Sequence, residues 1–145
     1  MFFYPWYHIF MSKLWVLIIL VIGIASAFYF YSKRPAPTAE DLIVIDSPKP
    51  GEIVTSPLTV KGKARGSWYF EASFPVRLED TNGSVLAQTP AQAQGEWMTN
   101  DFVPFEGTLE FFPPEIETGK LIFERDNPSG LPENSASLEV PVRFK

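Results

Sequence analysis

The chain has 145 residues, 12 of them basic and 17 acidic, and it contains no cysteine. The lack of cysteine excludes disulfides, thiolate metal sites and lipidation at cysteine. All 17 acidic residues lie at Glu40 or later, together with nine basic residues, which gives this part of the chain a net charge of −8. Because such a charge repels a phosphate backbone, the composition argues against nucleic acid as a partner.

Residues 14–31 form an uncharged apolar run, LWVLIILVIGIASAFYFY, directly after Lys13. At about 1.5 Å per residue a helix of this length spans roughly 27 Å, close to the hydrocarbon thickness of a bilayer. Ala25-Ser26-Ala27 is a sequence of the kind that signal peptidase cleaves. The aromatic residues and the basic pair that follow it are instead typical of an uncleaved anchor. We expect residues 14–31 to anchor the chain in the cytoplasmic membrane, with secretion after cleavage at Ala27 as the alternative.

The flanks of this run divide the chain into three parts. The preceding segment, MFFYPWYHIF, is aromatic and uncharged, and Met1 and Met11 are alternative starts of translation. Residues 32–41 hold two prolines and no apolar periodicity, which predicts a semi-stiff Pro-rich linker of on the order of 25 Å. We therefore expect an N-terminal tail and anchor over residues 1–31, this linker, and one domain over residues 42–145.

From residue 42 onward the sequence is typical of short strands separated by turns. Over residues 58–65 and again over 138–145, apolar and polar side chains alternate, as in a strand with one face in water. Asn82-Gly83 is the strongest hairpin signal, because both residues accept positive φ. Pro141 cannot donate to a ladder, which predicts that the last strand lies at an edge or that this position turns away from its neighbour. About seven such strands predict an all-β, immunoglobulin-like sandwich.

Four stretches of the domain follow a recognisable order: IVIDSPKPG at residues 43–51, VTSPLTVKGKA at 54–64, VRLEDTNGSVLA at 76–87 and VPV at 140–142. They resemble the Gmad2 family, the immunoglobulin-like domain of bacterial sporulation and spore-germination proteins, over about residues 43–144. The resemblance implies a sandwich fold, a domain on the extracytoplasmic side of the membrane and no assigned catalytic residue. Gly62 and Ala64 are expected to allow close packing between the sheets.

The sequence offers little for catalysis, a cofactor or a metal. The only histidine, His8, precedes the apolar run, so the domain has no imidazole for a Ser-His-Asp or Cys-His site. Asp80-x-Asn82-Gly83 begins like a calcium loop but lacks the later ligands, and a hairpin turn is the favoured interpretation. A carboxylate-only site on envelope glycans is the alternative, with these candidates: Glu71, Glu79, Asp80, Glu115 and Glu117. Since charged residues are usually solvated, we expect no catalytic, cofactor-binding or metal-binding residue.

Five residues form the candidate binding surface: Trp68, Tyr69, Trp97, Asp126 and Asn127. Both tryptophans lie beside glycine-containing turns, where exposed aromatic side chains bind sugars or proteins. Burial in the core or at its rim is the competing interpretation of these aromatics, and Phe70 is expected in the core. Asp126 and Asn127 open the loop of residues 126–135, which is predicted to be a mobile tip with oxygen ligands for a weakly bound hard cation.

These observations predict a non-enzymatic binding or scaffolding module, anchored in the membrane and contacting an envelope protein or a cell-wall polymer outside it. A carboxylate-dependent enzyme acting on envelope glycans is the alternative.

Overall fold

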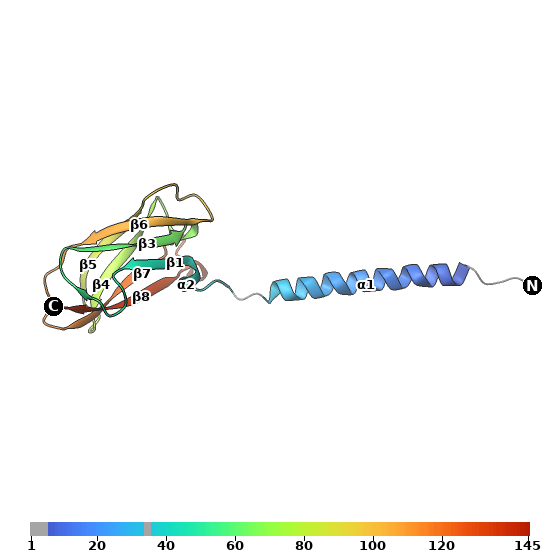
Figure 1. Cartoon of the computed structure of the whole chain (residues 1–145), viewed down its shortest axis with the longest axis horizontal. Helices are drawn as coiled ribbons and strands as arrows, with labels where there is room; N and C mark the ends of the chain where they lie inside the picture. The colour runs from blue at the N-terminus through green and yellow to red at the C-terminus, as the bar shows by residue number, and fades with distance from the viewer. Residues whose placement is uncertain (1–5, 34–35) are drawn as a thin grey trace, which may run out of the picture. The chain divides into compact units, whose positions relative to one another are not determined.

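The computed structural model of the chain describes residues 6–33 and 36–145, and the predicted tail before Trp6 lies outside the described residues. The chain divides into two units, one ending at Ala36 and the other comprising Pro37–Lys145 (Figure 1). The second unit is the domain that the strand pattern predicts.

The described part of the first unit holds one helix, α1 (Trp6–Ser32), of 27 residues. Its segment Lys13–Ser32 has a mean hydropathy of 2.3 and is long and apolar enough to cross a membrane. The described side chains of this segment are all exposed within the chain. A membrane anchor and a signal sequence both satisfy these criteria, so the helix confirms the apolar segment and leaves both roles open.

A short helix, α2 (Ala39–Leu42), occupies the end of the segment predicted as a linker, so the Pro-rich spacer is shorter than expected. The cause is a capping box: the Thr38 main-chain N–H and hydroxyl both donate to an oxygen of Asp41, at 2.9 and 3.0 Å. These hydrogen bonds hold the pKa of Asp41 below its usual value. Ala39 and Leu42 pack against the core of the domain, so α2 belongs to the domain.

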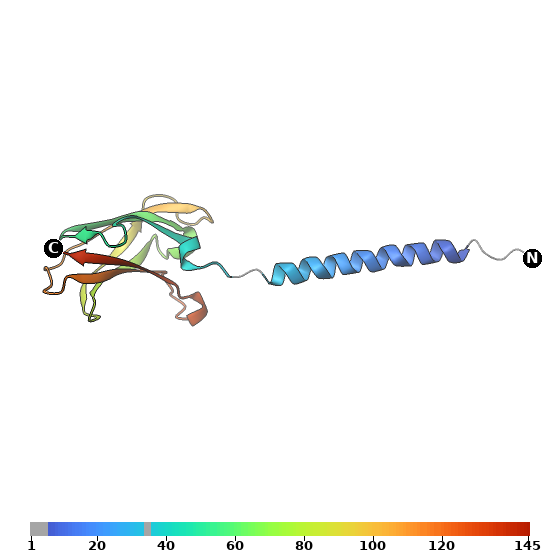
Figure 2. The ribbon, with the colours of Figure 1, turned by 60° about the horizontal axis from the view of Figure 1, so that its bottom comes forward.

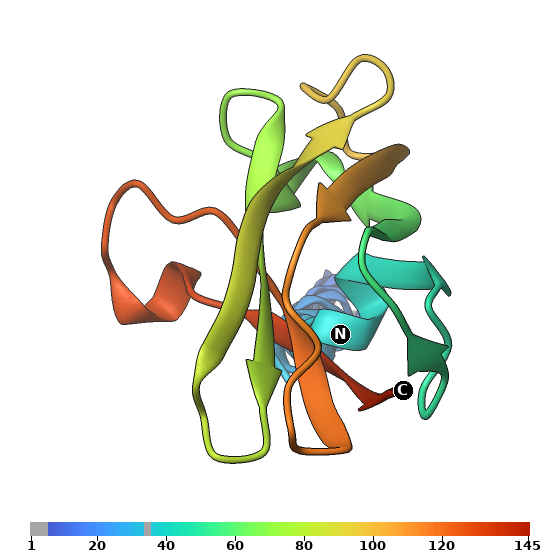
Figure 3. The same ribbon diagram turned by 90° about the vertical axis from the view of Figure 1, so that its left-hand side faces the viewer.

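The domain is built from eight strands in one hydrogen-bonded sheet with the order β1-β3-β6-β5-β4-β7-β8-β2. The sheet curls into two facing layers, as Figures 2 and 3 show, because β5 and β6 pair only at Gln92–Glu106 and Ala93–Phe105. One layer holds β1, β3 and β6, and the other holds the remaining strands. The strands are β1 (Ile43–Ser47), β2 (Ile53–Val54), β3 (Leu58–Arg65), β4 (Ser73–Asp80), β5 (Val85–Ala93), β6 (Phe102–Leu109), β7 (Thr118–Glu124) and β8 (Ser137–Phe144).

This arrangement confirms the predicted all-β, immunoglobulin-like sandwich. Neighbouring strands are antiparallel except β2, which pairs parallel to β8 at Ile53–Arg143 and Val54–Phe144. The strand count exceeds the expected seven because the two-residue β2 forms after the Pro-Gly corner. Two short 3-10 helices, Gly66–Trp68 and Pro132–Asn134, lie in the connections between strands.

The core lies between the two layers and follows the predicted alternation. Both layers contribute fully buried side chains: Val60, Ala64, Phe74, Val76, Leu78, Phe105, Leu121, Phe123 and Val142. Phe74 meets Phe105 edge to face with ring centroids 4.9 Å apart. Gly62 is required here, because a Cβ at this position would lie 2.8 Å from Cζ of Phe105 and would overlap the Val44 carbonyl oxygen. The close neighbours of Gly62 therefore lie in β1 and β6 of its own layer, and Ala64 is fully buried.

The position of Pro141 in β8 is also as predicted. Its carbonyl accepts a hydrogen bond from the Gly51 N–H at 2.7 Å, on the side of β8 that faces away from β7. The nitrogen of Pro141 points to the same side, where β2 pairs with β8 only at Arg143 and Phe144. The missing N–H therefore removes no bond from the β7–β8 ladder.

The hairpin between β4 and β5 forms at Asn82-Gly83, but only Gly83 has positive φ, at 83°. The expected two-residue turn is replaced by a longer loop, closed by bonds from the Asp80 N–H to Ser84 O and from the Gly83 N–H to Asp80 O, both 3.0 Å. The buried Asp80 carboxylate accepts from the N–H groups of Asn82 and Ser84, each at 2.9 Å. A bulge follows in the ladder, where Leu78 pairs with Ala87 and Glu79 pairs with Val85.

Replacing Asp80 by alanine is expected to lower the free energy of unfolding by about 1–2 kcal/mol, because two main-chain N–H groups lose a charged acceptor. Asp80→Asn keeps one acceptor oxygen and is expected to cost about half as much. Urea denaturation of residues 37–145 measures both changes, with Asp101→Ala on an exposed loop as the control. An Asp80→Ala variant as stable as the control would show that the turn does not depend on this carboxylate.

Candidate functional site

Two residues of the predicted binding surface, Trp68 and Tyr69, are buried, with exposed fractions of 0% and 5%. The 3-10 helix Gly66–Trp68 turns the chain inward after β3, and both rings then pack edge to face on Phe74, with centroids 6.4 and 5.2 Å away. The Tyr69 hydroxyl donates to the Val103 carbonyl at 2.7 Å. Trp68 and Tyr69 therefore do not form the candidate aromatic platform, and the interpretation of both as core residues is confirmed.

Phe70, which the sequence places in the core, is 41% exposed. Glu71 and Ala72 follow it with φ of 49° and 63°, in the left-handed region that non-glycine residues seldom adopt. They form a two-residue turn closed by reciprocal main-chain bonds between Phe70 and Ser73, at 3.0 and 3.1 Å. Because the turn reverses the chain here, Phe70 falls outside the core and Phe74 takes the buried position instead.

Trp97 is half-buried and packs against the outside of the core. It lines a shallow hollow of about 330 Å³ with Gly66, Ser67, Met98, Thr99 and Asn100. Neither Asp126 nor Asn127 lines this hollow, so the structure does not bring the three remaining candidates together at one place.

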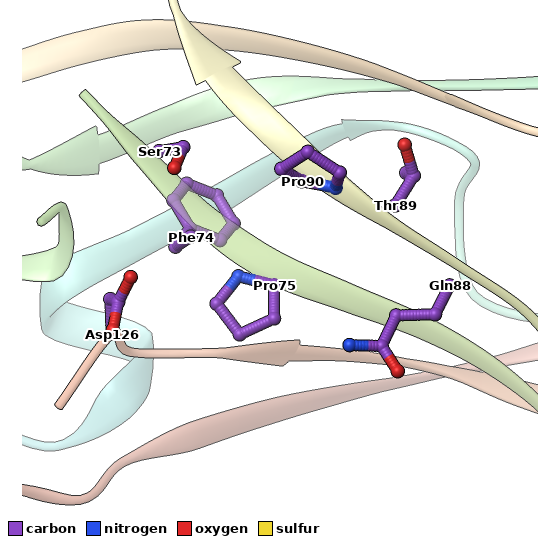
Figure 4. Close-up of a pocket in the computed structure, with 7 residues that line it drawn as sticks. All are labelled: Ser73, Phe74, Pro75, Gln88, Thr89, Pro90 and Asp126. Carbon is purple, nitrogen blue, oxygen red and sulfur yellow. The ribbon is translucent and has the colours of Figure 1, made fainter. Parts of the chain in front are cut away.

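Asp126 lines a different and larger hollow of about 510 Å³, which we call the Asp126 hollow. Its wall comes from β4, β5 and the start of the loop after β7, as Figure 4 shows: Ser73, Phe74, Pro75, Gln88, Thr89, Pro90 and Asp126. In Figure 4 the Pro75 ring lies between Asp126 on one side and Gln88 on the other. A second hollow of about 310 Å³ shares Pro75 and Asp126 with the first and also includes Asn127.

The apolar part of the Asp126 hollow arises from a pair of prolines. Pro75 in β4 lies directly opposite Pro90 in β5. Since neither residue has an N–H, they cannot exchange hydrogen bonds, and their main-chain groups point away from the partner strand. Side chains of such non-bonded pairs lie close together, so the two rings form one apolar wall.

The charged part of the hollow is unusual for this domain. Only four of its acidic residues are buried or half-buried: Glu79, Asp80, Glu124 and Asp126. Glu79 and Glu124 both pair with Arg77, with N–O distances of 3.3 and 3.1 Å, and Asp80 caps the hairpin. Among the described residues, the Asp126 carboxylate has neither a hydrogen-bond donor nor a cation as partner. Its main-chain N–H donates to Trp68 O at 3.1 Å, which holds the residue in place.

Asn127 has a structural role in the loop of residues 126–135. Its amide donates to Leu131 O at 2.8 Å and to Ser135 Oγ at 3.0 Å, and its amide oxygen accepts from Ser129 at 2.5 Å. Figure 3 shows this loop, in orange-red, at the left side of the domain. Because both ends of its side chain are bonded within the loop, Asn127 shapes the wall of the second hollow and is not free to bind a ligand there.

A sequence profile of the Gmad2 family, described as the immunoglobulin-like domain of bacterial spore germination, matches residues 42–130. The chain belongs to the Gmad2 family. The match covers more than half of the chain, from the end of α2 through β7, and confirms the resemblance seen in the strand motifs. No curated protein matches the chain.

All residues of the Asp126 hollow fall within the matched part of the Gmad2 domain. The described residues contain no group of three or more His, Asp or Glu side chains that could hold a metal ion. Two of the candidate carboxylates for a glycosidase have other partners. Glu79 is paired with Arg77, and the Asp80 carboxylate accepts a main-chain hydrogen bond in the β4–β5 hairpin. The Gmad2 domain therefore presents a small mixed surface, with one apolar wall and one unpaired carboxylate, that is suited to binding.

Proposed function

We propose that this chain is a membrane-anchored Gmad2 module with a non-catalytic binding role in the bacterial cell envelope, in the context of sporulation or germination. The observation that carries the proposal is the order of its parts: an apolar helix long enough to span a membrane precedes an immunoglobulin-like domain of spore-germination type. Immunoglobulin-like domains bind partners through loops and strand edges, and they seldom carry catalytic groups. The partner is an envelope protein or a cell-wall polymer.

The domain is proposed to lie on the extracytoplasmic side. Alkaline phosphatase folds only where its disulfides form, so a fusion after residue 40 is expected to be active in a bacterial host. The same fusion without residues 1–36 is the control and is expected to be inactive. An inactive full-length fusion would place the domain in the cytoplasm and overturn this part of the proposal.

Crosslinking of the full chain in its native host tests the binding role and the anchor together. We expect a covalent adduct with an envelope protein or with peptidoglycan, recovered from the membrane fraction. The intact mass of the membrane-associated chain is expected to include residues 1–27, and a product beginning at Phe28 would show cleavage after Ala27. Crosslinking that yields no adduct, together with no co-sedimentation with peptidoglycan, would contradict the binding role.

A further inference from the structure

We infer that the Asp126 hollow binds the basic side chain of an extended peptide, with the lysine ammonium or arginine guanidinium at the Asp126 carboxylate. This inference rests on the proposed binding role and names the ligand class of that role. It comes from three features of the hollow: its unpaired charge, its proline wall and the free main-chain edge of β5.

The charge of the hollow requires a cationic ligand. Asp126 is the only charged residue in its wall, and it is the one partly buried acidic side chain of the described domain without a partner. A partly desolvated carboxylate gains more from a cation than an exposed one does, because less water screens the pair. Two arginines whose side chains bond elsewhere do not supply that cation: Arg77 pairs with Glu79 and Glu124, and the Arg125 Nε–H donates to Ser67 O at 2.8 Å.

The proline wall suits the alkyl part of a basic side chain. Lysine and arginine have three or four methylene groups that pack along apolar surface while the charged end meets a polar group. Pro75 and Pro90 face each other and supply such a surface, and Figure 4 shows the Pro75 ring next to Asp126. The volume of about 510 Å³ is also within the range of roughly 300–1,000 Å³ that is common for ligand sites.

The edge of β5 favours a peptide over a small free amine. Because Pro75 and Pro90 cannot form a bonded pair, the alternation of an antiparallel ladder makes Arg77–Gln88 a non-bonded pair as well. The main-chain N–H and C=O of Gln88 therefore point away from β4. Among the described strands β6 pairs with β5 only from Gln92 onward, so these groups are free to bond an added extended chain.

The test is saturation-transfer NMR on the full chain in phosphatidylcholine nanodiscs. The probe is acetyl-Ala-Lys-Ala-amide, and its matched control carries Nε-acetyl-lysine, which lacks the charge. We expect the lysine peptide to bind at least about tenfold more tightly than the acetylated peptide. Asp126→Asn is expected to weaken the lysine peptide about tenfold and to abolish the difference between the peptides. The matched control variant Asp101→Asn removes the same charge from an exposed loop and is expected to bind like the wild type.

A second variant, Pro90→Ala, is expected to weaken the lysine peptide by about three- to fivefold, because packing area on the alkyl chain is lost. Circular dichroism checks that each variant is folded, and the comparison of the two peptides on the wild type decides the question even if Asp126→Asn does not fold. Equal affinity for both peptides, no signal above empty nanodiscs, or unchanged binding by folded Asp126→Asn would each overturn the inference. If crosslinking in the host gives an adduct but the lysine peptide does not bind, the proposed binding role in the envelope is supported. In that case only the inference of a basic peptide ligand is wrong.

Discussion

Replacing Trp68 by alanine is expected to lower the free energy of unfolding of residues 37–145 by about 3–5 kcal/mol, the largest effect of any change considered for this domain. The Trp68 ring is fully buried and packs edge to face on Phe74, so its removal leaves a cavity that the surrounding strands cannot close. Urea denaturation followed by circular dichroism measures this loss.

Two other variants make the Trp68 experiment specific. Phe112→Ala removes an aromatic ring that is 93% exposed and is expected to change stability by no more than about 0.5 kcal/mol. Trp68→Phe is expected to cost clearly less than Trp68→Ala, since it keeps most of the packing. It also loses no hydrogen bond, because the indole Nε1 has no hydrogen-bond partner among the described residues. A Trp68→Ala variant as stable as Phe112→Ala would mean that Trp68 lies at the surface, as an aromatic platform would.

Tyr69 is expected to make the domain unstable at high pH. Burial raises the pKa of its hydroxyl from 10.0 to about 12. Between these values the tyrosine of the unfolded chain ionises while that of the folded domain stays neutral, so the unfolded state is favoured as the pH rises. The contribution of Tyr69 to the free energy of unfolding is fully present below pH 10. It is lost as the pH rises from 10 to about 12, and the total loss is roughly 2–3 kcal/mol.

The Tyr69→Phe variant isolates this effect, because Tyr69 is the only tyrosine after residue 36. Its free energy of unfolding is expected to be about 1 kcal/mol lower at pH 7, since the Val103 carbonyl loses its donor. Between pH 10 and 12 this free energy is expected to fall less steeply than that of the wild type. Urea denaturation of both proteins at several pH values between 7 and 12 gives the difference directly. Parallel declines of the two proteins would show that Tyr69 ionises normally and that other groups cause the alkaline unfolding.

Alternation along the strands was enough to predict most of the fold. Leu58, Val60, Ala64, Val140 and Val142 are buried as their period of two requires, because successive side chains of a strand point to opposite faces. This pattern depends only on neighbouring residues. The family motifs were recognisable for the same reason, since prolines and glycines act on the local backbone.

The candidate site was predicted only in part. Asp126 lines a hollow, but Pro75 and Pro90, which form its apolar wall, were missed, because alternation along one strand does not show which residues face each other across two strands. A two-residue turn at Asn82-Gly83 would pair Thr81 with Ser84 and would already place Pro75 opposite Pro90. In the structure the longer loop pairs Glu79 with Val85, and the bulge between Leu78 and Glu79 restores the simple register, so the two prolines still face each other.

The sequence by itself determined that this protein has an apolar helix followed by an acidic, cysteine-free domain of immunoglobulin type, because charge, length and alternation are local properties. Only the tertiary structure decided which aromatic and acidic side chains are free to contact a binding partner. Trp68 and Tyr69 turn inward at a 3-10 helix, and Phe70 is carried outward by the tight turn that follows. The Asp126 carboxylate has no partner among the described residues, and the neighbouring Arg125 donates its Nε–H to Ser67 O. Burial and pairing of this kind depend on residues far apart in the chain. The alternation of apolar and polar residues along a strand therefore does not predict them.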